Sequence, residues 1–266
     1  MIRLWEAAVR GRRGLRLLLG HAAANASPPP ALFFHHIAKT GGTSFIRTMR
    51  TMVPPELQAS ENGDVSVWFV ERLIAAGLKP GQFIYGHPGP GAAAPLRDRA
   101  CMAVMLRQPR EQAISNYLWV QQDWRLPDHA AASALDFRGF LAARPYFAIF
   151  QAASLHVGLN IRPLDRLPAL VDALPALTDY LGQFQLVGVT EQAPDFYAEA
   201  CRILGLPHPP KLPHHRKSRI PQQDRQQMRE QYEGLRTDPE LGPLIAAEEA
   251  LFLACQRIRH REPVAD

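Results

Sequence analysis

The sequence contains few cysteines, and their positions suggest neither a metal site nor a disulfide framework. Cys101, Cys201 and Cys255 lie far apart and form no Cys-x-x-Cys or Cys/His spacing. Each is surrounded by apolar residues, so we expect three buried thiols. Free thiols agree with a reducing compartment, and we therefore predict a cytoplasmic protein with no metal ion.

The chain also lacks a long apolar run and a strong charge imbalance. No 18-residue apolar segment is present, so the sequence predicts no membrane-spanning helix. The net charge of +5 suits a protein that handles anionic ligands, but it does not indicate a nucleic-acid partner. Hydrophobic residues make up 47% of the 266 residues, enough for a substantial core in one large domain.

The first 30 residues differ from the rest in composition. Residues 1–16 contain five arginines and one glutamate, and the short apolar run that begins at Leu15 is interrupted by Arg16 and His21. We interpret residues 1–20 as a basic amphipathic arm that contacts the protein or a membrane surface, with an export signal as the alternative. The Pro-rich segment 27–30 is a stiff spacer, and residues 31–266 are predicted to form a single domain.

The segment from Ala31 to Phe45 contains the most informative pattern. An apolar run typical of a buried strand is followed by Lys39, two glycines and several hydroxyl residues, and then by a helical pattern. A strand that turns through glycines into a helix presents backbone N–H groups and the positive end of the helix dipole, which bind phosphate-like anions. The order differs from a Walker A loop, because Lys39 precedes Gly41. An ordinary strand–turn–helix with a Thr or Ser cap is the alternative.

Two further predicted strands end at or next to residues whose side chains could act in catalysis or ligand binding. Residues 82–87 form a short strand that reaches His87 before a Pro/Gly loop, and residues 101–106 precede Arg107. Strands alternate with helices along the chain, which predicts an α/β fold: a three-layer P-loop-like domain with a mainly parallel sheet flanked by helices. Ligands bind at the carboxyl ends of such strands, so Lys39, His87 and Arg107 are expected to share one crevice.

Two motifs resemble those of sulfotransferases that use 3′-phosphoadenylyl sulfate (PAPS). HIAKTGGTSF resembles the 5′-phosphosulfate loop of the carbohydrate (heparan/uronyl 2-O-sulfotransferase-like) branch, which commonly reads HIPKTGGTS; Ala38 replaces the proline. Arg107, followed by Pro109 and by Ser115 on the next predicted helix, resembles the family's 3′-phosphate motif. Gln108 and Gln112 replace an Asp and an Arg of that motif, so a supporting salt bridge is expected to be missing.

The resemblance implies sulfuryl transfer from PAPS to a hydroxyl acceptor, with PAP as product and no metal. The acceptor is expected to be a carbohydrate. Lys39 and His87 are the implied catalytic residues, with His87 as general base in the Gly86-His87 pair. The nucleotide is expected to contact a set of residues that includes part of a basic C-terminal loop: Lys39, Thr40, Gly41, Gly42, Thr43, Ser44, Arg107, Ser115, Arg216 and Lys217.

Several alternatives stay open at this stage. Residues 119–150 interleave aromatic and basic side chains, which suits an acceptor-binding wall but equally suits core packing. A peptide tyrosine or a lipid hydroxyl could replace the sugar as acceptor. A non-catalytic nucleotide- or glycan-binding protein would keep the phosphate contacts without needing His87. A kinase would need the Walker order and a carboxylate for Mg²⁺, and the sequence shows neither. The oligomeric state is not indicated.

Overall fold

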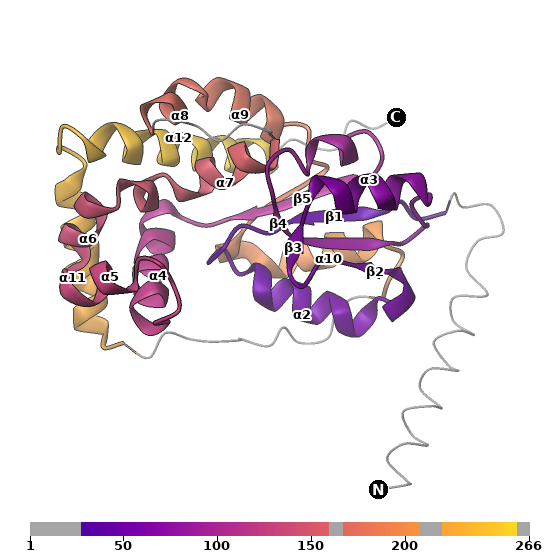
Figure 1. Ribbon diagram of the computed structural model, residues 1–266, viewed down its shortest axis with the longest axis horizontal. Helices are drawn as coiled ribbons and strands as arrows, with labels where there is room; N and C mark the ends of the chain where they lie inside the picture. Colours follow the sequence, from indigo (N-terminus) through magenta and orange to yellow (C-terminus); the bar gives the residue numbers. More distant parts are fainter. Residues whose placement is uncertain (1–27, 160–166, 208–219, 260–266) are drawn as a thin grey trace, which may run out of the picture.

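The computed structural model describes residues 28–159, 167–207 and 220–259. Its centre is a parallel sheet with strand order β2-β4-β1-β5-β6, and a short β3 also pairs in parallel with β4. Figure 1 shows this sheet with helices on both sides. The strands are β1 (Leu32–His35), β2 (Gln58–Ala59), β3 (Asp64–Val65), β4 (Phe83–Pro88), β5 (Cys101–Leu106) and β6 (Leu186–Val189). The chain thus has the predicted α/β fold.

Helices connect the strands and continue beyond them. In chain order they are α2 (Gly42–Met52), α3 (Val67–Ala75), α4 (Pro109–Gln122), α5 (His129–Ala134), α6 (Phe137–Ala143), α7 (Phe150–Leu159), α8 (Pro168–Asp172), α9 (Leu174–Leu181), α10 (Ala193–Ile203), α11 (Gln222–Leu235) and α12 (Leu241–Arg259).

The alternation of side chains along β1 divides the core into two layers. Leu32 and Phe34 pack with the buried faces of α2 and α10, whereas Phe33 belongs to the larger cluster that includes α7, α9 and α12. All four residues of β1 are buried, because a central parallel strand is covered on both faces. The same alternation places His35 and His36 on opposite sides, His35 beside Phe184 and His36 beside Phe34.

Helices α4 and α11 lie beyond the end of β5, next to α5 and α6 (Figure 1). Glu111 in the first turn of α4 accepts a hydrogen bond from Nε of Arg229 on α11 at 2.7 Å, and Nη1 of Arg225 lies 3.5 Å from the other carboxylate oxygen. An acidic residue in the first turn of a helix also interacts favourably with the helix dipole. These contacts hold α11 against α4 at the carboxyl edge of the sheet.

A buried carboxylate from α12 fixes the start of α7. Oε1 of Glu248 accepts the N–H of Gln151 and Oε2 accepts the N–H of Ala152, at 2.8 and 3.0 Å. Burial raises the pKa of Glu248 to about 7, and these two N–H groups lower it by a smaller amount. The Gln151 side chain in turn exchanges two hydrogen bonds with the backbone N–H and carbonyl of Arg107. Helix α12 thereby supports the residue that follows β5.

Most of the elements expected from the sequence are present, with shifts at their ends. The strand expected at residues 101–106 is β5, and the one expected at 82–87 is β4, which begins at Phe83 and ends at Pro88. Asp238 accepts the N–H groups of Glu240 and Leu241, the two bonds that a helix N-cap makes, just before α12. The two-residue strands β2 and β3 were not predicted, since such short segments carry no clear periodicity.

The cysteines are free, as expected, although Cys101 is only partly buried. The N-terminal arm at residues 1–20 lies outside the described residues. Within the described part of the chain, no helix has the length and apolar character needed to cross a membrane.

Candidate active site

The turn between β1 and α2 has a tightly fixed backbone. Lys39 and Gly41 both adopt positive φ angles, 66° and 86°, and Gly41 is the N-cap residue of α2. The Thr40 hydroxyl donates to the carbonyl of Ile37 at 2.9 Å. The Thr190 hydroxyl, just after β6, lies 2.6 Å from the Thr40 carbonyl and 3.1 Å from that of Leu106. The turn is therefore anchored to the ends of two other segments of the chain.

The first residues of α2 leave backbone donors at this turn. The N–H groups of Ser44 and Phe45 donate to the Gly41 carbonyl. Those of Gly42 and Thr43 come earlier in the helix, where an N–H group has no acceptor within the helix itself. No side chain of the described residues caps α2, so the alternative of a Thr or Ser cap is wrong. Thr43 is exposed and Ser44 is partly buried. Ser44 was expected to contact the nucleotide, but its N–H already donates to the Gly41 carbonyl. The Ser44 hydroxyl is therefore the group that could make this contact.

Arg107 reaches back from β5 to the Lys39 turn. Its Nη1 donates to the carbonyl of Lys39 at 3.2 Å. Its Nε is buried, and the described residues provide no hydrogen-bond partner for it. Burial lowers the pKa of Arg107, and the nearby carboxylates Glu191 and Glu111 raise it in part. A buried guanidinium with an unused donor is suited to bind a further anionic group.

Other predicted site residues lie nearby or outside the described parts. Ser115 lies in the second turn of α4 and is partly buried. The amide of Gln112 lies 3.4 Å from the carbonyl of Ala38, so one of the two residues that depart from the motif contacts the turn through a long, neutral hydrogen bond. Arg216 and Lys217 fall outside the described residues.

Two histidine rings stack at the end of β1 and β4. The centroids of His36 and His87 are 4.2 Å apart, with an angle of 25° between the ring planes. Burial lowers the pKa of His87; a backbone hydrogen bond with His36 and the charge of Asp64 raise it by less. Burial, together with the neighbouring histidines, also lowers the pKa of His36 to about 3. Both imidazoles are thus neutral at pH 7, and His87 is the one exposed to solvent.

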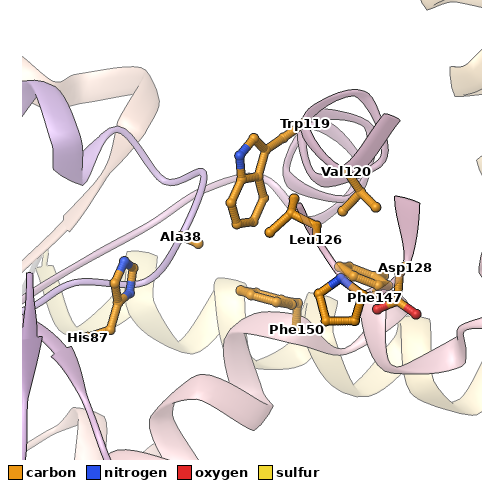
Figure 2. A pocket seen from close by; sticks show the side chains of 9 residues that line it. Ala38, His87, Trp119, Val120, Leu126, Asp128, Phe147 and Phe150 are labelled. Carbon is orange, nitrogen blue, oxygen red and sulfur yellow. The ribbon is translucent and has the colours of Figure 1, made fainter. Parts of the chain in front are cut away.

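Two cavities meet at His87. The first, which we call the aromatic slot, has a volume of about 280 Å³ and is shown in Figure 2. It is lined by Ala38, His87, Trp119, Val120, Leu126, Pro127, Asp128, Phe147 and Phe150. The second, the polar cavity, has a volume of about 600 Å³. It is lined by His36, Thr43, Ile46, Arg47, Arg50, Ser60, Asn62, Gly63, Asp64, Tyr85 and His87.

Lys39 lies next to two residues that line the slot, Ala38 and Trp119. Its ammonium nitrogen lies 5.7 Å from the centroid of the Trp119 ring, within the range of a cation–π interaction. In Figure 2, Trp119 and Phe150 lie on opposite sides of the slot, with His87 near one end and Asp128 near the other. Among the described residues, no group of three or more His, Cys, Asp or Glu side chains could hold a metal ion.

Sequence reasoning did not assign a role to several residues that shape this region. His36, Thr190, Gln151 and Glu248 act here through contacts between segments far apart in sequence. Of these, His36 could have been suspected, because it directly follows a buried strand and precedes the Lys39 turn. Trp119 was included only in a broad aromatic region.

Comparisons with known proteins give one structural likeness. No protein-family model matches the chain, and no curated protein sequence matches it. A crystal structure of a sulfotransferase from Alicyclobacillus acidocaldarius is similar at a TM-score of 0.42 and 16% sequence identity, over 90% of this chain and 98% of that one. A likeness of this size does not assign a function.

Proposed function

We propose that this protein transfers a sulfuryl group from PAPS to a hydroxyl group of an acceptor. The observation that supports this most strongly is the hydrogen bond from Arg107 to the carbonyl of Lys39. The segments that resemble the 5′-phosphosulfate loop and the 3′-phosphate motif of PAPS-dependent sulfotransferases are therefore in contact. A single doubly phosphorylated nucleotide could bridge them.

The turn before α2 suits the 5′ end of such a nucleotide. The N–H groups of Gly42 and Thr43 and the positive end of the helix dipole favour an anion there. Lys39 contributes a full positive charge, and Thr43 and Ser44 contribute hydroxyl donors. These groups would also stabilise the negative charge that develops on the departing phosphate, which is the main electrostatic contribution expected in such transfers.

Arg107 and Ser115 suit the 3′-phosphate. The buried Nε of Arg107 has no partner among the described residues and is the kind of donor that a phosphate oxygen would satisfy. The basic loop residues Arg216 and Lys217 stay predicted contacts of the nucleotide. PAPS supplies the sulfuryl group and leaves as PAP.

His87 is proposed as the general base. The acceptor oxygen forms a bond to sulfur, the bond between sulfur and the phosphate oxygen breaks, and the acceptor proton passes to the imidazole. An imidazole can accept this proton only when it is neutral, and the lowered pKa of His87 keeps it neutral at pH 7. The resemblance to the carbohydrate branch makes a sugar hydroxyl the acceptor expected from the motifs.

A nucleotide titration tests the proposal. Calorimetry with 3′,5′-ADP and with 5′-AMP should show tighter binding of 3′,5′-ADP by about tenfold or more, because a charge-assisted contact to phosphate contributes about 1.5–3 kcal/mol. Ser115→Ala should reduce this preference. Ser133→Ala, the same change on the exposed surface of α5, should leave it unchanged. Equal affinity for the two nucleotides would refute the 3′-phosphate contact.

The His87→Ala variant separates an enzyme from a non-catalytic binding protein. Turnover should fall by about 10²- to 10⁴-fold while the affinity for 3′,5′-ADP is nearly kept, because a general base acts on the chemical step. Unchanged turnover would remove His87 from this role. Nucleotide binding with no sulfuryl transfer by the wild type to any acceptor would favour the binding protein.

A further inference from the structure

The aromatic slot offers its occupant few polar partners. Of the nine described residues that line it, His87 and Asp128 have polar or charged side chains, apart from the indole N–H of Trp119. Asp128 already pairs with Nε of Arg144. The remaining lining groups are aliphatic or aromatic. A ligand in this slot would therefore meet apolar walls along its length and the imidazole of His87 at one end (Figure 2).

The walls of the slot are held in place by packing. The rings of Phe147 and Phe150 are stacked, with centroids 5.8 Å apart and 9° between the ring planes. Phe147 also contacts the ring of Phe140, which is fully buried. Val120 is almost fully buried. A preformed apolar site binds a rigid ligand without a large ordering cost.

The slot also lies where sulfuryl transfer would occur. Ala38, which precedes Lys39, lines it, and the Lys39 ammonium lies over the Trp119 ring at the slot wall. His87 lines it as well. A hydroxyl brought to His87 from this slot would therefore be next to the residue proposed to bind the sulfuryl-bearing phosphate.

We infer that the acceptor is a compact phenol, of one or two rings, bound in the aromatic slot. This inference rests on the proposed sulfotransferase function and changes the acceptor class from the sugar that the motifs suggest. A sugar ring has several hydroxyl groups, and burying a hydroxyl without a partner is costly. The slot volume of about 280 Å³ lies just below the range usual for drug-sized ligands, which limits the occupant to a small one.

The polar cavity on the other side of His87 is the competing position. It contains Arg47, Arg50 and Asn62, and so could satisfy the hydroxyl groups of a sugar. The slot is favoured because two of its lining residues adjoin Lys39: Ala38 precedes it in the chain, and the Trp119 ring lies 5.7 Å from its ammonium nitrogen. The polar cavity reaches the same turn through Thr43, but neither Ala38 nor Trp119 is among the described residues that line it.

Binding and transfer experiments can distinguish the two positions. With saturating 3′,5′-ADP present, calorimetry with 4-nitrophenol should show saturable binding. Leu126→Trp, which fills the slot, should raise the Kd for 4-nitrophenol by about tenfold or more. Leu253→Trp makes the same change at an exposed position of α12 and should leave the Kd unchanged. In both variants the affinity for 3′,5′-ADP should match the wild type, which also shows that each is folded.

Acceptor rates complete the test. With PAPS as donor, 2-naphthol and 4-nitrophenol should be sulfated with a higher kcat/KM than methyl glycosides, and Leu126→Trp should lower the phenol values mainly through KM. Higher kcat/KM for a glycoside, reduced by Arg47→Ala and not by Leu126→Trp, would overturn the inference and leave the sulfotransferase proposal intact. Absence of 4-nitrophenol binding to the folded wild type would also overturn it. Failure of 3′,5′-ADP to bind would instead refute the proposed function.

Discussion

At the scale of single residues, the environment of each histidine differs although three of them lie close together. His35 and His36 are adjacent in sequence but face opposite layers of the core, and burial lowers the pKa of each to about 3. Part of the His87 side chain is exposed, and burial of the rest lowers its pKa. Exposure is what lets His87 exchange a proton with a ligand, so it is the histidine best placed for acid–base chemistry.

The pH dependence of turnover follows from this difference. A general base is active in its neutral form, so kcat/KM should be highest where His87 is neutral and should fall as pH decreases through its lowered pKa. Because that pKa is below 6.5, the midpoint of the fall should also lie below pH 6.5. Steady-state values of kcat/KM across this pH range measure it, since kcat/KM reports the pKa of the free enzyme. The acid limb should be absent from the residual activity of His87→Ala, and a midpoint above 7 would contradict the assignment.

At the scale of elements, the start of α2 is packed against the end of β1 so closely that a side chain has no room. A Cβ atom on Gly42 would lie 2.2 Å from Cδ2 and 2.6 Å from Nε2 of His36. The His36 ring in turn stacks on His87. The helix that presents the anion-binding N–H groups and the histidine pair are therefore positioned by one contact.

Gly42→Ala tests this contact. The added methyl should displace the His36 ring, lower the free energy of unfolding by about 1–3 kcal/mol and reduce turnover. Gly234→Ala, within α11, is the matched control, because no atom of another described segment lies within 4 Å of a Cβ there. That change should stabilise the protein by about 0.5–1 kcal/mol, as expected for a glycine inside a helix. Urea denaturation measures both, and an unaffected Gly42→Ala protein would show that the ring moves freely.

At the scale of the whole molecule, buried titratable groups link stability to pH. The unfolded chain binds a proton at His35 and His36 near pH 6.5, whereas the folded chain does so only near 3. Their contribution is complete above pH 6.5 and is lost as pH falls below it. Glu248 acts in the opposite direction: its folded pKa of about 7 exceeds the ordinary 4.5, so the folded chain gains stability as pH falls from 7 to 4.5.

The expected result is a two-part acid profile. Between pH 6.5 and 4.5 Glu248 offsets about one histidine, and the free energy of unfolding should fall by about 1.4 kcal/mol per pH unit. Below 4.5 the fall attributable to these groups should be steeper. Urea unfolding across this range measures the slope, and His35→Leu should remove most of it between pH 6.5 and 4.5. An unchanged slope in that variant would exclude His35 as its cause.

The sequence by itself determined the α/β class, the main buried strands and the turns at which the polar residues of the candidate site lie. Apolar runs identify β1 and β5 because central parallel strands are buried on both faces. The glycines and Lys39 identify the turn before α2, since local backbone requirements are visible in local sequence. Residues Lys39, His87 and Arg107 were expected at one edge because parallel strands end together. Their roles, and those of Ser115, stay predictions.

Only the tertiary structure decided which residues meet across that edge. Three contacts join segments that lie between 51 and 150 residues apart in the sequence: Arg107 with Lys39, Thr190 with Thr40, and His36 with His87. The slot likewise forms from three separate segments, at residues 38, 87 and 119–150. Periodicity reports which side of an element is buried, but not which distant element covers it, so the apolar character of the slot became apparent only in the folded chain.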